Sequence, residues 1–102
     1  MAAATEGAAA AGGVTVALQP GTEREPSAAT VVLPTGLGEL RNGLLVRCAD
    51  TVIAIGGSWG TLSEVALAMR TGVPVVAIGG WAVPGVPVAD TPAEALAVLG
   101  MA

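Results

Sequence analysis

The residues best suited to chemistry are the glycines and hydroxyls between positions 56 and 61. They follow an apolar run ending at Ile55 and precede a segment with helical periodicity. A glycine-rich turn between a strand and a helix lets backbone N–H groups approach an anion, and the helix N-terminus favours negative charge. We therefore predict a phosphate or nucleotide site at this turn. Its expected binding residues are Gly56, Gly57, Ser58, Gly60 and Thr61.

The expected donors are the amides of Gly57, Gly60 and Thr61, together with the Thr61 hydroxyl. The spacing is not G-x-G-x-x-G and no lysine follows, so neither a dinucleotide fingerprint nor a P-loop is predicted. Spacing alone leaves the ligand generic, as a small molecule that carries a phosphate. The alternative interpretation is a tight strand-to-helix turn that binds nothing.

Three further side chains near this turn each have two interpretations. Glu64 either completes an S/T-x-x-E capping box with Thr61, or binds ribose hydroxyls or accepts a proton from water. Arg41 either is solvated or faces the ligand, since it follows a glycine-rich connector at the end of the sheet where open α/β sheets bind ligands. Trp59 either stacks on a base, or covers the core or a dimer contact.

Composition narrows the function classes. The 102 residues suffice for one small domain, and a hydrophobic content of 53% excludes a disordered chain. A net charge of −4 argues against nucleic-acid and anionic-membrane binding. The lone Cys48 excludes an intrachain disulfide and a cysteine metal cluster, and we expect it to pack rather than to react. The setting expected is cytoplasmic, with no metal.

The predicted elements alternate between helix and strand, which is typical of an α/β protein with a mostly parallel sheet. An apolar face at Leu40, Leu44 and Cys48 marks one helix, and Gly72 ends the helix that follows the glycine turn. Thr91 is the expected N-cap of the last helix. We expect helices at 1–11, 39–49, 61–71 and 91–100, and strands at 14–18, 30–33, 51–55 and 73–78. The uncharged stretch 71–89 contains too many glycines and prolines for a membrane-spanning helix.

The pattern Gly56-Gly57-x-x-Gly60-Thr61-x-x-Glu64 resembles the P-G-G-x-G-T-x-x-E signature of the Lonely Guy family, part of a Rossmann-like superfamily. The similarity runs from residue 1 to about 97. Lonely Guy enzymes are phosphoribohydrolases that release a base from a nucleoside 5′-monophosphate. The resemblance implies that Arg41 and Glu64 correspond to their catalytic pair. The family's M-x-x-R-K, however, reads Gly-Glu-Leu-Arg41-Asn42 here.

Arg41-Asn42, Ala49-Asp50 and residues 54–57 look closest to a bacterial branch related to the molybdenum cofactor carrier proteins. That branch implies binding of a nucleotide or molybdopterin without a required cofactor, in a homo-oligomer. The resemblance also implies an N-terminally truncated Rossmann-like domain that lacks the first strand-helix-strand. The strand at 14–18 would then have no neighbour unless it lies beside 51–55. Three functions remain: a binding protein for a phosphorylated small molecule, a phosphoribohydrolase, and an inactive fragment.

Overall fold

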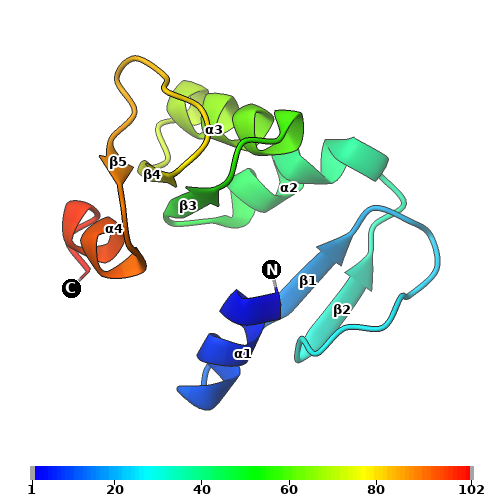
Figure 1. Cartoon of the computed structure of the whole chain (residues 1–102). Coiled ribbons are helices and arrows are strands. Elements are labelled where there is room, and N and C mark those ends of the chain that lie inside the picture. Colours follow the sequence, from blue (N-terminus) through cyan, green and yellow to red (C-terminus); the bar gives the residue numbers. More distant parts are fainter. Residues whose placement is uncertain (1, 102) are drawn as a thin grey trace. The chain divides into compact units, whose positions relative to one another are not determined.

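The computed structural model describes residues 2–101, which form two compact units divided after Arg41. Figure 1 follows the chain through both units. All strand pairs are parallel and helices flank the strands, so the predicted α/β class is confirmed. The expectation of a single domain over the whole chain stays a prediction. No helix among residues 2–101 has the length and apolar character needed to cross a membrane.

The first unit contains one helix and a two-stranded sheet. Helix α1 (Ala2–Ala10) is followed by a turn at Gly12, whose φ of 81° places it in the left-handed region. Strand β1 (Val16–Gln19) pairs with β2 (Val31–Pro34) in a register that aligns Val16 with Val31. The expectation that this strand lacks a neighbour is therefore wrong, because a strand only about a dozen residues downstream supplies one. Gln19 fixes the connecting loop through two hydrogen bonds of 2.9 Å to the Glu25 backbone.

The second unit contains a three-stranded sheet in the order β3-β4-β5. The 3-10 turn η1 (Gly38–Leu40) leads into helix α2 (Arg41–Cys48), at whose first residue the units divide. The remaining elements are β3 (Val52–Ile55), α3 (Trp59–Thr71), β4 (Val75–Ile78), β5 (Val88–Ala89) and α4 (Pro92–Val98). The short β5 is an addition to the elements expected from the sequence. Gly72 and Thr91 cap α3 and α4 as predicted.

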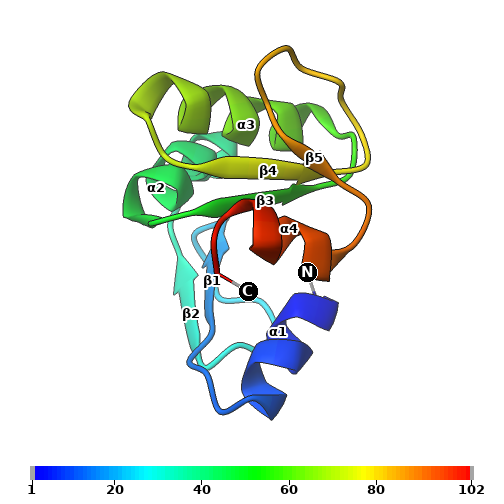
Figure 2. The same ribbon diagram turned by 90° about the vertical axis from the view of Figure 1, so that its left-hand side faces the viewer.

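Strand β4 is covered on both faces, as the continuous apolar run in its sequence indicates. Val75 and Ala77 face a cluster that includes Val65 of α3, whereas Val76 faces Ala95 of α4. Figure 2 shows α3 and α4 on opposite sides of this strand. The buried core consists of valine and alanine side chains. Because these side chains are small, the core is filled by backbones that approach closely and not by large aromatic side chains.

The expected face of helix α2 differs from the one observed. On α2, Leu44 and Cys48 are exposed, and the buried residues are Asn42 and Val46. The prediction that Cys48 packs in the core is therefore wrong. Apolar side chains lie all around this helix, so periodicity alone selects the wrong face. On α3 the buried residues are Val65 and Ala68.

Candidate functional site

The register of the sheet brings two glycine pairs together. Ile55 pairs with Ile78, so β3 and β4 end at the same level, and the Gly56 amide donates to the Ile78 carbonyl at 3.1 Å. Each strand then turns on glycines, Gly56 with φ 93° and Gly80 with φ 74°. A Cβ on Gly80 would overlap the carbonyl oxygen of Gly56, and one on Gly57 would lie 3.3 Å from the Gly80 Cα. Only glycine allows this close approach of two backbones.

Ser58 is the N-cap of α3, and its position defines where the helix begins. Its Oγ accepts a hydrogen bond from the Thr61 amide at 3.1 Å and shares one of 2.9 Å with the Thr61 hydroxyl. Thr61 is therefore the third residue of the helix rather than its cap. The capping-box interpretation of Glu64 is wrong, because Glu64 lies a full turn beyond the position from which it could reach back to the N-cap.

Four consecutive amides at this end of α3 have no acceptor among residues 2–101. The N–H groups of Gly57, Ser58, Trp59 and Gly60 make no hydrogen bond to another described residue. All four residues are exposed. The predicted amide donors of Gly57 and Gly60 are thus available, whereas the Thr61 amide is engaged by Ser58. A helix N-terminus with unused donors is a favourable place for an anion.

A buried polar chain supports the first turn of α3 from within. The Asn42 Nδ2 donates to the Ser63 Oγ at 3.1 Å, and the Ser63 Oγ donates to the Gly60 carbonyl at 2.7 Å. Asn42 is only 7% exposed, and its Oδ1 has no partner among the described residues. Neither Asn42 nor Ser63 was predicted from the sequence as a site residue. A Cβ on Gly60 would lie 3.6 Å from the Asn42 Nδ2, an ordinary contact distance, so no local signal in the sequence pointed to this chain of contacts.

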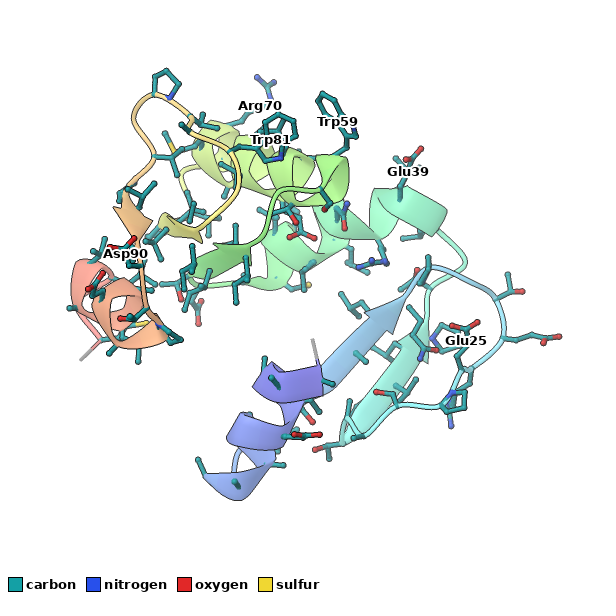
Figure 3. The ribbon with its side chains drawn as sticks, viewed as in Figure 1. Glu25, Glu39, Trp59, Arg70, Trp81 and Asp90 are labelled. Carbon is teal, nitrogen blue, oxygen red and sulfur yellow. The ribbon has the colours of Figure 1, made fainter. Side chains whose placement is uncertain are left out.

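Both tryptophans of the chain lie beside the glycine pairs (Figure 3). Trp59 is the first residue of α3 and is 76% exposed. Trp81 follows Gly80, and its indole N–H donates to the Ser58 carbonyl at 3.0 Å. The two rings are 4.8 Å apart at their centroids and tilted by 40°. The exposure of Trp59 excludes the interpretation that it covers the core. Trp81 was not predicted from the sequence as a site residue.

The two predicted catalytic residues lie on different units of the structure. Glu64 lies half-buried in the second turn of α3. Arg41 is the first residue of α2 and is half-buried, and its Nε has no partner among the described residues. Because the units divide directly after Arg41, the pairing of these two side chains stays a prediction.

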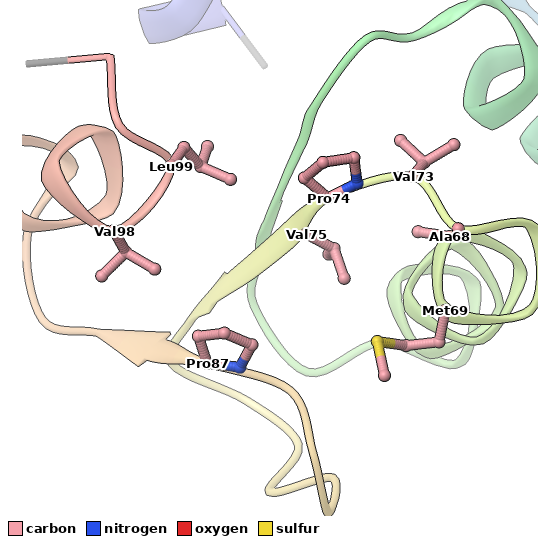
Figure 4. A pocket seen from close by; sticks show the side chains of 9 residues that line it. Ala68, Met69, Val73, Pro74, Val75, Pro87, Val98 and Leu99 are labelled. Carbon is pink, nitrogen blue, oxygen red and sulfur yellow. The ribbon is translucent and has the colours of Figure 1, made fainter.

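An open hollow of about 410 Å³ lies at the other end of β4, where the strand begins (Figure 4). Its lining consists entirely of apolar side chains and one glycine, with Met69, Val75 and Leu99 among them. It therefore offers no side chain that recognises a phosphate. Residues 2–101 also contain no group of three or more His, Cys, Asp or Glu side chains placed to hold a metal ion.

Comparison with known proteins gives three similarities. The model of the SLOG cluster4 family matches residues 1–98. An uncharacterized protein of Archaeoglobus fulgidus is 35% identical over 98 residues, which cover 94% of this chain and 65% of the archaeal protein. The chain thus spans less than two thirds of the length of that relative.

The third similarity is to a solved structure, that of the molybdenum cofactor binding protein from the phototrophic bacterium Rippkaea orientalis. The TM-score is 0.86 and the sequence identity 31%, over 98% of this chain and 69% of the bacterial one. The likeness extends over both units of the present chain, and the fold is Rossmann-like.

Proposed function

The chain belongs to the SLOG cluster4 family, and from this premise we propose that it binds a phosphorylated small molecule, a nucleotide or a pterin cofactor, at residues 56–61. A structural relative at 31% identity is a molybdenum cofactor binding protein, which favours a pterin cofactor such as molybdopterin. The ligand's phosphate lies against the N-terminus of α3 in this proposal.

The observation that carries the proposal is the set of four unused amides from Gly57 to Gly60. They lie just before and within the first turn of a helix of 13 residues, whose dipole favours a negative charge at this end. Gly56, Gly57 and Gly60 have no side chain, so a phosphate can approach the backbone closely at these positions. The resemblance stated above suggests Arg41 as the cation for the same anion, and this assignment is part of the proposal; the Arg41 Nε has no partner among the described residues.

The test is a calorimetric titration of the whole chain with AMP and with ribose 5-phosphate. We expect saturable binding of both, weakened by Gly60→Val. Valine at this position places its methyl groups against the side chains of Asn42 and Ser58, 3.6 and 3.7 Å from the Cβ, and so displaces the loop.

The matched control is Gly7→Val, since Gly7 also lies in a helix and has nothing within 4 Å of an added Cβ. We expect it to leave both affinities unchanged. Absence of binding heat and of any thermal stabilisation with AMP, ribose 5-phosphate and a pterin phosphate, neopterin monophosphate, would refute the proposal and would favour the inactive-fragment alternative.

A second candidate function is hydrolysis of the N-glycosidic bond of a nucleoside 5′-monophosphate. The observation in its favour is that Glu64 lies half-buried in the second turn of α3, the helix that begins at the proposed phosphate site. In this mechanism Arg41 orients the phosphate or ribose, and Glu64 assists the attack of water at the anomeric carbon. Incubation with AMP tests it by the appearance of free adenine. No release, or release equal in Glu64→Gln, would exclude this activity and leave the binding proposal intact.

A further inference from the structure

We propose that Trp59 is a stacking surface for the planar heteroaromatic ring of the ligand, a purine or a pterin, with Trp81 as its backing. This inference rests on the proposed function, because it assigns the ring of a molecule whose phosphate lies at the start of α3. It adds a second contact with the ligand, which recognises the aromatic ring and not the phosphate.

Neither tryptophan is part of the buried core. Trp59 is 76% exposed, whereas the core is built from valine and alanine. A large aromatic ring left in water on a small protein gains free energy when another apolar surface covers it. The position of Trp59 therefore requires an explanation beyond folding.

The Trp59–Trp81 pair is held in place by the backbone of the loop. Trp81 packs against Trp59 at 4.8 Å, and its indole N–H is fixed on the Ser58 carbonyl at 3.0 Å. A ring between the two indoles would need about 7 Å, twice a stacking distance of roughly 3.5 Å. The gap is too narrow, so the ligand's ring lies on the outer side of Trp59.

The apolar surface that Trp59 offers is small. The exposed residues next to Trp59 in the loop are Gly57, Ser58 and Gly60, which add no large apolar side chain. A stable protein interface buries roughly 800 Å² on each partner, well beyond two indoles. A single planar ring fits this area, and the amides beside it that have no acceptor among the described residues donate hydrogen bonds to the phosphate of the same molecule.

The experiment compares Kd values by calorimetry for three probes: AMP, neopterin monophosphate and ribose 5-phosphate. We expect Trp59→Ala to weaken the better of the two ring-bearing probes about tenfold and to change the Kd of ribose 5-phosphate by less than about twofold. Trp59→Phe should retain most of the affinity, because the smaller ring still stacks. The probe that loses more in Trp59→Ala identifies the ring as a purine or a pterin.

Val98→Ala on α4 is the control, since Val98 is 49% exposed and lies in a different element. It should leave all three affinities unchanged. Equal losses for the ring-bearing probes and ribose 5-phosphate in Trp59→Ala, or no loss at all, would overturn the stacking surface. A wild-type dimer that Trp59→Ala dissociates would also overturn it, because the tryptophans would then form a contact between copies.

Failure of the proposed function gives a different result. If wild-type protein binds none of the phosphate compounds, the phosphate site is refuted, and adenosine and neopterin are then titrated alone. If adenosine or neopterin gives a heat of binding with the wild type and none with Trp59→Ala, the result would support a ring site without a phosphate site. No heat with either compound would overturn the stacking surface as well.

Discussion

The close approach of the two glycine turns predicts an unequal cost for two neighbouring substitutions, Gly79→Ala and Gly80→Ala. Both residues have positive φ, 67° and 74°, so alanine is strained at each. The left-handed conformation costs roughly 1–2 kcal/mol for a non-glycine residue, partly offset by about 0.4–1 kcal/mol from a less flexible unfolded chain. Gly79→Ala should therefore lower the free energy of unfolding by about 1 kcal/mol.

Gly80→Ala has the same backbone strain from a positive φ and, in addition, a steric overlap. Its Cβ would overlap the Gly56 carbonyl and approach the Gly57 Cα, whereas nothing lies within 4 Å of a Cβ on Gly79. Forcing extra volume into a packed region costs typically about 1–3 kcal/mol. The total for Gly80→Ala is then about 2–4 kcal/mol, a large share of the roughly 5–15 kcal/mol that stabilises a typical domain.

The assay is urea unfolding followed by far-UV circular dichroism, with both variants measured beside the wild type. The quantity of interest is the difference between the two variants, because it cancels the strain they share. Equal losses of unfolding free energy, or a larger loss in Gly79→Ala, would refute the close approach of Gly80 to Gly56. A Gly80→Ala protein that is already unfolded while Gly79→Ala remains folded would agree with it.

Three other outcomes follow from the contacts around α3 and from the surface of α2. Ser58→Ala removes the N-cap and should cost about 1 kcal/mol in thermal unfolding, and no loss would contradict the bond from Thr61. Ser63→Ala leaves the Asn42 amide buried without its acceptor and should cost about 1–3 kcal/mol in urea unfolding, so a neutral result would argue against that contact. Cys48 is exposed, so the native protein should react with a thiol reagent such as DTNB as fast as the denatured protein does, and strong protection would contradict that exposure.

The order of elements could be predicted because turn and cap residues are local signals. Gly72 ends α3 and Thr91 begins α4, each through its own backbone conformation or side chain. Strand pairing is not local, so the sequence did not predict that Val16 lies opposite Val31. The two-residue β5 was missed because so short a strand has no periodicity to detect.

The glycine turn was predicted as a site from its residue types, but its supporting residues could not be. Trp81 reaches the Ser58 carbonyl only because β3 and β4 end in register, a relation between distant segments. The capping-box pattern Thr61-x-x-Glu64 predicts a helix start at Thr61. In the structure Ser58 is the N-cap, so the helix begins two residues earlier, at Trp59. The face of α2 was wrong because its apolar residues are not confined to one side.

The aromatic composition of the chain has an optical consequence. Trp59 and Trp81 are the only aromatic residues, since the sequence has no tyrosine or phenylalanine. Fluorescence and near-UV dichroism of this protein therefore report on the turns after β3 and β4 alone, and the first unit has no chromophore of this kind. At 4.8 Å the two indoles also couple electronically, so a change in their distance or tilt changes the dichroism directly. The wild-type chain thus contains its own spectroscopic label, located at the one place where labelling would be most useful.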